Sequence, residues 1–237
     1  MNKTVSETVD FIAKLKKKDF SDNRDVLICP PFTALSDASK LVKGSKVLLG
    51  AQNMHFEESG AFTGDISPLM LKEVGCKYVI IGHSERRHVF GEDDALINKK
   101  LKSALDNRLL PILCVGELID ERKGGKTEDI VKGQLINGLD GIKDIGKIVV
   151  AYEPVWAIGT GETATPNQAE EVHVLIRSLI KEKYGDKAAV NLRILYGGSV
   201  KPENVKELMS KEDIDGVLVG GASLDVEKFF KLINFDN

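Results

Sequence analysis

The sequence predicts an α/β protein, a (β/α)₈ barrel that lacks its first β-strand. Short apolar runs alternate with amphipathic stretches along the whole chain of 237 residues. The apolar runs are rich in β-branched residues and show no polar alternation, which is typical of parallel strands buried on both faces. No linker, low-complexity segment or change of composition divides the chain, so we expect residues 1–237 to form one domain. Repeated strand–helix units in a domain of this length favour a barrel over an open doubly wound sheet.

Helices are predicted from capping residues and from apolar periodicity. Thr4 and Glu7 have the spacing of a capping box, and Ile12 and Leu15 then lie on one helical face. Thr165 is a candidate cap for a later and longer helix. The clearest helical patterns after the first cover Asp93–Asn107, Thr127–Leu139 and Asn167–Tyr184, and the last of these is the helix that Thr165 would cap.

The apolar runs predict seven strands: Val26–Cys29, Val47–Ala51, Tyr78–Ile81, Ile112–Val115, Ile148–Tyr152, Leu192–Tyr196 and Gly216–Val219. Pro111 stands just before the fourth run, at a position that a strand tolerates. A parallel barrel of this class closes with eight strands, and here a helix opens the chain. We therefore expect one strand to be missing from the front. A sequence that starts late is favoured over a true loss, which would leave unpaired strand edges.

The composition excludes several classes of protein. The chain is 42% hydrophobic and 29% charged, which is enough for a large core and too apolar for disorder. A net charge of −3 gives no basic field, so nucleic acid is not expected as a partner. Cys29, Cys76 and Cys114 have no metal-binding spacing and are expected to be reduced thiols. With no apolar run of membrane length and no signal peptide, we expect a soluble cytoplasmic protein.

One carboxylate stands where a buried strand meets an apolar loop. Glu153 follows the fifth apolar run, and Pro154 keeps it extended because a residue before proline avoids the helical region. The next residues are largely apolar and include Trp156, whereas loops normally carry polar residues. Composition alone leaves two readings about equal, a connection packed into the core and a lid over a site. The lone acid beside the loop favours the lid.

Other candidate residues also stand at strand ends. His83 follows the third apolar run and opens a predicted helical turn, whose amide groups would keep its ring neutral. A lone histidine is more often structural, and we interpret His55, His88 and His173 as structural or exposed. Glycine pairs follow the last two strands, where a barrel often binds phosphate. One such pair is weak evidence for a binding site. Two pairs favour an anion site built from Gly197, Gly198, Ser199, Gly220 and Gly221.

Four of these segments, taken in order, resemble the triosephosphate isomerase family and its TIM barrel: Tyr78–Arg87, Ala151–Gly161, Tyr196–Val200 and Val219–Ser223. The resemblance extends from Met1 to the C-terminal helix. In the family the first strand ends in Asn-x-Lys-Met-Asn, and here Met1 and Asn2 match only the last two residues. The family's catalytic lysine would therefore fall immediately before Met1, which agrees with the strand count.

The resemblance implies a reaction and a set of roles. Glu153 would move a proton between neighbouring carbons of dihydroxyacetone phosphate and D-glyceraldehyde 3-phosphate, while His83 would hydrogen-bond the oxygens of the enediol(ate). This pairing of a glutamate base with a neutral histidine is an established example in general enzymology. Gly159, Ser199, Gly220 and Gly221 would bind the substrate. No cofactor or metal is expected.

Further expectations concern the partner and the remaining polar residues. Gln52–Asp65 resembles the loop with which subunits of the family interlock as a homodimer, although an ordinary surface excursion is the simpler reading without the family. Glu85 is either an ion-pair partner or a proton-transfer group, and we favour the structural role. Arg86 and Arg87 are expected in ion pairs. The alternatives to the isomerase are a phosphate-binding pseudoenzyme, if the strand and lysine are truly absent, and another phosphate-binding barrel enzyme.

Overall fold

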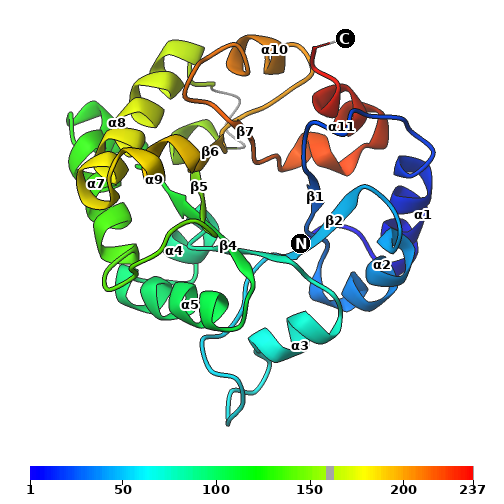
Figure 1. Cartoon of the computed structure of the whole chain (residues 1–237). Helices are drawn as coiled ribbons and strands as arrows, with labels where there is room; N and C mark the ends of the chain where they lie inside the picture. The colour runs from blue at the N-terminus through cyan, green and yellow to red at the C-terminus, as the bar shows by residue number, and fades with distance from the viewer. Residues whose placement is uncertain (159–162, 237) are drawn as a thin grey trace.

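A computed structural model describes residues 1–158 and 163–236 of the chain. One parallel sheet follows the order of the sequence from β1 to β7 and curls at the centre of a ring of helices (Figure 1). The strands of this sheet are β1 Val26–Ile28, β2 Val47–Ala51, β3 Tyr78–Ile81, β4 Leu110–Val115, β5 Val149–Tyr152, β6 Arg193–Tyr196 and β7 Gly216–Val217. The predicted α/β barrel class and the count of seven strands are thus confirmed for the described part of the chain.

Helices follow the strands and form the outer layer (Figure 1). The α-helices are α1 Val5–Leu15, α2 Leu35–Val42, α3 Pro68–Glu73, α4 Ser84–His88, α5 Asp94–Asp106, α6 Ile119–Lys123, α7 Thr127–Gly138, α8 Pro166–Tyr184, α9 Asp186–Asn191, α10 Val205–Leu208 and α11 Val226–Ile233. Three short 3₁₀ turns are η1 Phe32–Ala34, η2 Val155–Ala157 and η3 Gly221–Leu224. The capping boxes predicted at Thr4 and Thr165 are both present.

The strands are buried on both faces, as their continuous apolar sequences predict. Inside the curl, Ile80, Ile112, Cys114 and Ala151 pack together. The intervening residues, such as Val150 and Tyr152, point to the layer between sheet and helices. This alternation matters for the site, because it decides which side chain at the end of β5 faces the interior.

Two details of the strand assignment are corrected. Pro111 lies inside β4 and stands beside Val79 of β3, because β4 begins at Leu110, two residues before the predicted start at Ile112. The last strand keeps only Gly216 and Val217 of the predicted Gly216–Val219. Among the described residues, β1 pairs only with β2 and β7 only with β6.

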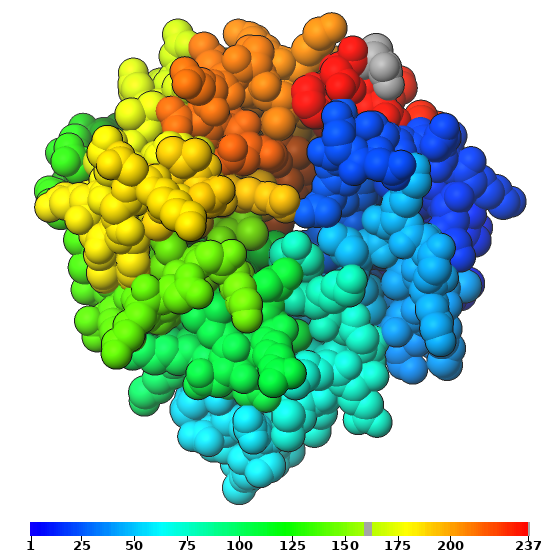
Figure 2. Space-filling model, in the orientation of Figure 1, coloured from blue at the N-terminus to red at the C-terminus, as the bar shows by residue number. Residues whose placement is uncertain are grey.

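The first and last helices, α1 and α11, are neighbours in the ring. The blue N-terminal and red C-terminal segments meet in the space-filling view (Figure 2), where Lys18 pairs with Glu227 at 2.7 Å. The segment of residues 52–66 projects from the ring at the lower edge of Figures 1 and 2. No helix in the described ranges is long and apolar enough to cross a membrane.

Candidate active site

Glu153 is fixed at the end of β5 by its backbone and by the neighbouring strands. Its N–H donates to the carbonyl of Val115 on β4 at 2.7 Å, and its side chain is almost fully buried. On the β6 side, a Cβ added at Gly197 would lie 2.8 Å from Cγ of Glu153. The missing side chain of Gly197 therefore gives the glutamate its space.

The carboxylate of Glu153 lies against the start of α4. Its Oε1 is 2.9 Å from Nε2 of His83, and its Oε2 accepts the backbone N–H of Ser84 at 2.9 Å. These contacts join the end of β5 to the end of β3, although the residues are far apart in the sequence. The structure thus brings together the two residues that the sequence predicts to be catalytic.

The hydrogen bonds of His83 define its proton. Its Nδ1 accepts the N–H of Glu85 at 3.3 Å, so the proton of the neutral ring lies on Nε2 and points to Glu153. Burial lowers the pKa of His83, but the hydrogen bond and charge of Glu153 outweigh it, and the pKa lies above its ordinary value. The amide of Glu85 makes the predicted contact with the ring, but the carboxylate of Glu153 has the larger effect on the pKa of His83.

The arginines that follow His83 are structural, as predicted. Arg86 pairs with Glu92, whose carboxylate also accepts Nζ of the buried Lys100. Arg87 pairs with Asp94 at 2.6 Å and also donates to the carbonyl of Gly82 at 2.9 Å. These contacts anchor α4 and hold the segment that carries His83.

Glu85 lies beside the site and outside its buried centre. Its side chain is exposed, and its carboxylate is 3.9 Å from Nδ1 of His83. It therefore contacts the ring on the side away from Glu153, which is consistent with the structural role that we favoured.

The two glycine pairs have different structural roles. The N–H of Gly197 donates to the carbonyl of Tyr152, so it is already used, and a Cβ at Gly198 would lie 2.2 Å from the hydroxyl of Tyr196. Packing therefore excludes a side chain at either glycine of the first pair, and the N–H of Gly197 is not available to an anion. Gly220 and Gly221 are exposed at the start of η3, and a Cβ at either would meet no atom within 4 Å.

Ser199 and the second glycine pair follow neighbouring strands. β6 and β7 pair in parallel, so the segments after them emerge at the same end of the sheet as Glu153. Ser199 is half-buried, and its carbonyl accepts the side-chain amide of Asn204 at 3.0 Å. Amides of Gly220 and Gly221 open towards solvent are suited to an anion. Gly159, the other predicted substrate-binding residue, lies outside the described residues.

A buried acid that the sequence analysis missed holds the root of the apolar loop. Glu117 is fully buried and follows β4 as Glu153 follows β5. It accepts the indole N–H of Trp156 at 3.0 Å and the hydroxyl of Tyr152 at 3.1 Å, and it pairs with Arg122. An acid two residues after the end of a buried apolar run was the available signal. These bonds fix the first half of the loop to the neighbouring strand end.

The buried thiol of Cys114 lies beside Glu153, and burial, followed by the charge of Glu153 and a hydrogen bond with it, raises the pKa of this thiol. The other histidines are not part of this contact. His173 is fully buried and its Nδ1 is 3.0 Å from the carbonyl of Asp213, whereas His88 is exposed. The thiols are free, and burial raises the pKa of Cys29 to about 12 and that of Cys76 to about 11. Within residues 1–158 and 163–236, no group of three or more histidine, cysteine or acidic side chains could hold a metal ion.

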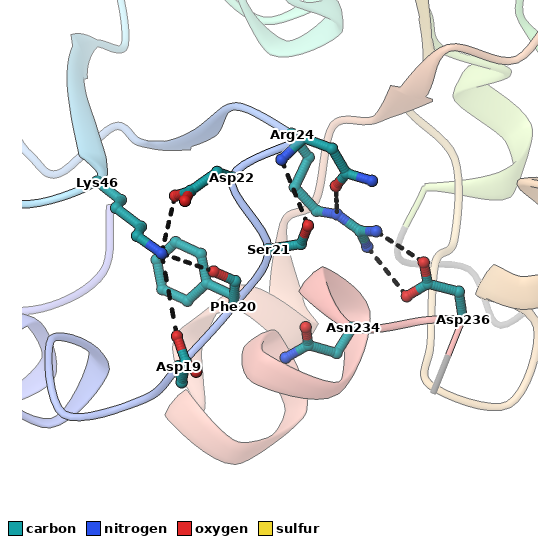
Figure 3. Close-up of a pocket in the computed structure, with 9 residues that line it drawn as sticks. Asp19, Phe20, Ser21, Asp22, Arg24, Lys46, Asn234 and Asp236 are labelled. Carbon is teal, nitrogen blue, oxygen red and sulfur yellow. Dashed lines mark hydrogen bonds and ion pairs between the residues drawn. The ribbon is translucent and has the colours of Figure 1, made fainter.

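A separate polar cavity of about 740 Å³ lies at the opposite end of the strands, where residues 19–24 lead into β1 (Figure 3). Its charges are satisfied within the protein. Lys46 pairs with Asp22 at 2.8 Å, and Arg24 pairs with Asp236 at 2.7 Å. This cavity ties the C-terminal segment to the entrance of β1 and is distinct from the site at Glu153.

Comparison with known proteins gives a consistent family. The family model described as triosephosphate isomerase matches residues 1–236. The chain is similar to a triosephosphate isomerase of Alkaliphilus metalliredigens, with 54% identity over 99% of this chain and 96% of the relative. It is 52% identical to proteins of the same name from Clostridium tetani and Caldanaerobacter subterraneus, over 99% of this chain and 93% and 96% of those relatives.

Proposed function

The chain belongs to the triosephosphate isomerase family, and we propose that Glu153 and His83 are its catalytic pair. It is an isomerase that interconverts dihydroxyacetone phosphate and D-glyceraldehyde 3-phosphate, a step of glycolysis and gluconeogenesis. The observation that carries the assignment of the pair is the contact between the buried carboxylate of Glu153 and Nε2 of His83 at 2.9 Å. A base and a proton donor lie together at the carboxyl ends of barrel strands, where such enzymes place their chemistry.

Glu153 acts as the base in this proposal. Its carboxylate removes a proton from the carbon next to the carbonyl and returns it to the neighbouring carbon. Bound substrate would take the place of His83 and Ser84 as the contact of this carboxylate. Because Gly197 leaves space beside Cγ, the side chain can turn without a clash from β6.

His83 acts as the donor to the oxygens of the enediol(ate). Its Nε2–H, which now points to Glu153, would point to a substrate oxygen once the carboxylate has turned. The pKa of His83 would then fall, since Glu153 is what raises it in the unliganded arrangement. A neutral imidazole can give a proton to one oxygen and take it back from the other, which the reaction requires.

The phosphate is assigned to Ser199, Gly220 and Gly221, together with Gly159 in the apolar loop. Support comes from the exposed glycines at the start of η3 and from their position at the same end of the sheet as Glu153. The loop itself acts as a lid, rooted through Trp156 to Glu117. A closed lid would exclude water and discourage loss of phosphate from the intermediate.

The subunit is proposed to form a homodimer through the projecting segment of residues 52–66. In that segment the tilted rings of His55 and Phe62 have centroids 4.0 Å apart, while Phe62 remains exposed. Other large apolar side chains are also exposed, at Phe32, Leu69, Met70, Val89 and Phe90. Exposed apolar surface often marks an interaction site, and contact between two subunits would cover these side chains. We propose that this homodimer is cytoplasmic and holds neither cofactor nor metal. Light scattering of the purified protein would give the mass of a monomer if this assignment is wrong.

The activity is tested with purified protein and D-glyceraldehyde 3-phosphate, with formation of dihydroxyacetone phosphate followed by a coupled dehydrogenase. Non-phosphorylated glyceraldehyde serves as the comparison substrate. We expect rapid turnover of the phosphorylated triose and very slow turnover of the other. A folded wild-type protein without turnover would instead favour the phosphate-binding pseudoenzyme.

A further inference from the structure

We propose that Gln134 is a positioning residue for this reaction, because it fixes the backbone on which Glu153 and the root of the lid rest. Gln134 lies on α7, outside the barrel, and its side chain contacts Gly116 at the end of β4. Its Oε1 accepts the N–H of Gly116 at 2.7 Å, and its Nε2 donates to the carbonyl of the same residue at 3.1 Å. The side-chain amide of Gln134 thus binds both the N–H and the carbonyl of Gly116.

Gly116 is in direct contact with the catalytic strand end. A Cβ added at Gly116 would lie 1.8 Å from the carbonyl oxygen of Glu153, so the two backbones touch. The regular ladder between β4 and β5 ends at the pair Val115 and Tyr152. Beyond that pair, the backbone of Glu153 depends on the segment that Gln134 holds.

The residues on either side of Gly116 carry the catalytic segment. The carbonyl of Val115 accepts the N–H of Glu153 at 2.7 Å, and the carbonyl of Glu117 accepts the N–H of Val155 at 3.1 Å. The side chain of Glu117 also accepts the indole of Trp156 at 3.0 Å. A shift of residues 115–117 would therefore move the base and the lid together.

Gln134 itself touches neither Glu153 nor His83 through any described hydrogen bond, so its effect passes through Gly116. This inference rests on the proposed function of Glu153. A misplacement of about 1 Å can cost on the order of 10²-fold in rate. Ser199, Gly220 and Gly221, which follow β6 and β7, do not depend on Gly116. The loss should therefore fall mainly on kcat, and only Gly159 of the lid could pass a smaller effect to KM.

The primary test is Gln134→Met, which keeps the length of the side chain and removes both hydrogen bonds. We expect kcat to fall about 10- to 100-fold with KM within about twofold. The matched control is Asn98→Leu. Asn98 also has a side-chain amide with two bonds to backbone, to the carbonyls of Gly138 at the end of α7 at 2.7 Å and of Asp140 at 2.9 Å, but it lies away from the site. Its kcat should stay within about twofold, although it loses comparable stability.

Gln134→Glu adds a readout that general destabilisation would not give. At neutral pH the carboxylate has no proton to donate to the carbonyl of Gly116, so only the bond from the N–H of Gly116 remains. Protonation of this carboxylate at lower pH restores a donor. The ratio of its kcat to that of wild type should therefore rise as pH falls. A constant ratio, or a Gln134→Met kcat equal to that of Asn98→Leu, would overturn the proposal.

A measurement without turnover separates this proposal from the proposed function. Glu153 raises the pKa of His83 in the unliganded protein, so a loosened Glu153 should let that pKa fall. NMR titration should find a lower pKa for His83 in Gln134→Met than in wild type or Asn98→Leu. An unchanged pKa would contradict the role of Gln134 even if the wild-type protein proved inactive on triose phosphates.

Discussion

Two histidines lie near the end of β5, one on each side of the sheet. Glu153 reaches His83 on the side of the barrel interior at 2.9 Å, while the preceding residue, Tyr152, packs edge-on against His173 of α8 with ring centroids 6.0 Å apart. Burial disfavours the charged form of both rings. Nevertheless the pKa of His83 lies above its ordinary value, whereas burial lowers that of His173 to about 4.

The difference comes from the partner that each ring has. His83 faces a carboxylate, which favours the imidazolium, and His173 faces the carbonyl of Asp213, which is a weaker partner. Nε2 of His173 has no hydrogen-bond partner among the described residues. The charge of the partner, and not the burial of the ring, therefore decides whether the pKa of each histidine lies above or below its ordinary value.

Removing the charge of Glu153 should have the largest effect. Glu153→Gln keeps the shape of the side chain but cannot take a proton, and a positioned base contributes typically 10²–10⁴-fold. We expect kcat to fall by at least about 10³-fold, with circular dichroism unchanged. Near-normal turnover in the folded variant would remove Glu153 from its assigned role.

Replacing His83 should cost somewhat less. His83→Gln retains a donor near Oε1 of Glu153 but cannot shuttle a proton between two oxygens. Loss of one such stabilising group typically costs about 10²–10³-fold in kcat. The matched control is His173→Gln, for which kcat at pH 7.5 should remain close to that of wild type. Equal losses in the two variants would mean that His83 has no special role.

Weakening the root of the lid should have a moderate effect. Trp156→Phe removes the indole N–H that donates to Glu117 at 3.0 Å. A hydrogen bond to a charged group contributes about 1.5 kcal/mol, and such a loss corresponds to roughly tenfold in kcat/KM. Steady-state kinetics would measure it. If kcat/KM is unchanged, the bond between Trp156 and Glu117 does not influence closure.

His173 should affect stability and leave the rate unchanged. Its folded pKa of about 4 lies below its ordinary 6.5, so the unfolded chain binds a proton that the native protein does not between these values. The contribution of His173 to the free energy of unfolding is therefore fully present above about pH 6.5. It falls by roughly 3 kcal/mol as the pH drops towards 4. Urea unfolding at several pH values should find a shallower acid loss in His173→Asn. Equal pH slopes would show that His173 is not the group responsible.

Much of this arrangement could be predicted from the sequence, since strand runs, helix caps and strand-end residues depend on neighbours along the chain. Glu153 and His83 were identifiable because each follows a buried apolar run. That the two meet could be expected only from the rule that parallel strands end at one edge. The distances between them depend on the registers of β3, β4 and β5, which no local pattern contains.

Other features could not be predicted from the sequence, because they depend on contacts between distant segments. The pair Gly197 and Gly198 looked like an anion cradle, but its glycines make room for Glu153 and the Tyr196 hydroxyl. Gln134 looks like an ordinary polar residue of α7, since nothing near it in the sequence indicates Gly116. The raised pKa of His83 also could not be foreseen, because the helix turn alone predicts a shift in the opposite direction.

The central claim is that Glu153 and His83 form one coupled pair, and an NMR titration of the histidines tests it most directly. Wild-type protein and Glu153→Gln would be titrated without ligand, with His173 as the internal reference. We predict that the pKa of His83 lies above 6.5 in wild type and drops below it in the variant, where only the weaker effect of Glu85 opposes burial, while His173 keeps its low value. A pKa of His83 that is the same in both proteins would contradict the coupling on which the proposed mechanism depends.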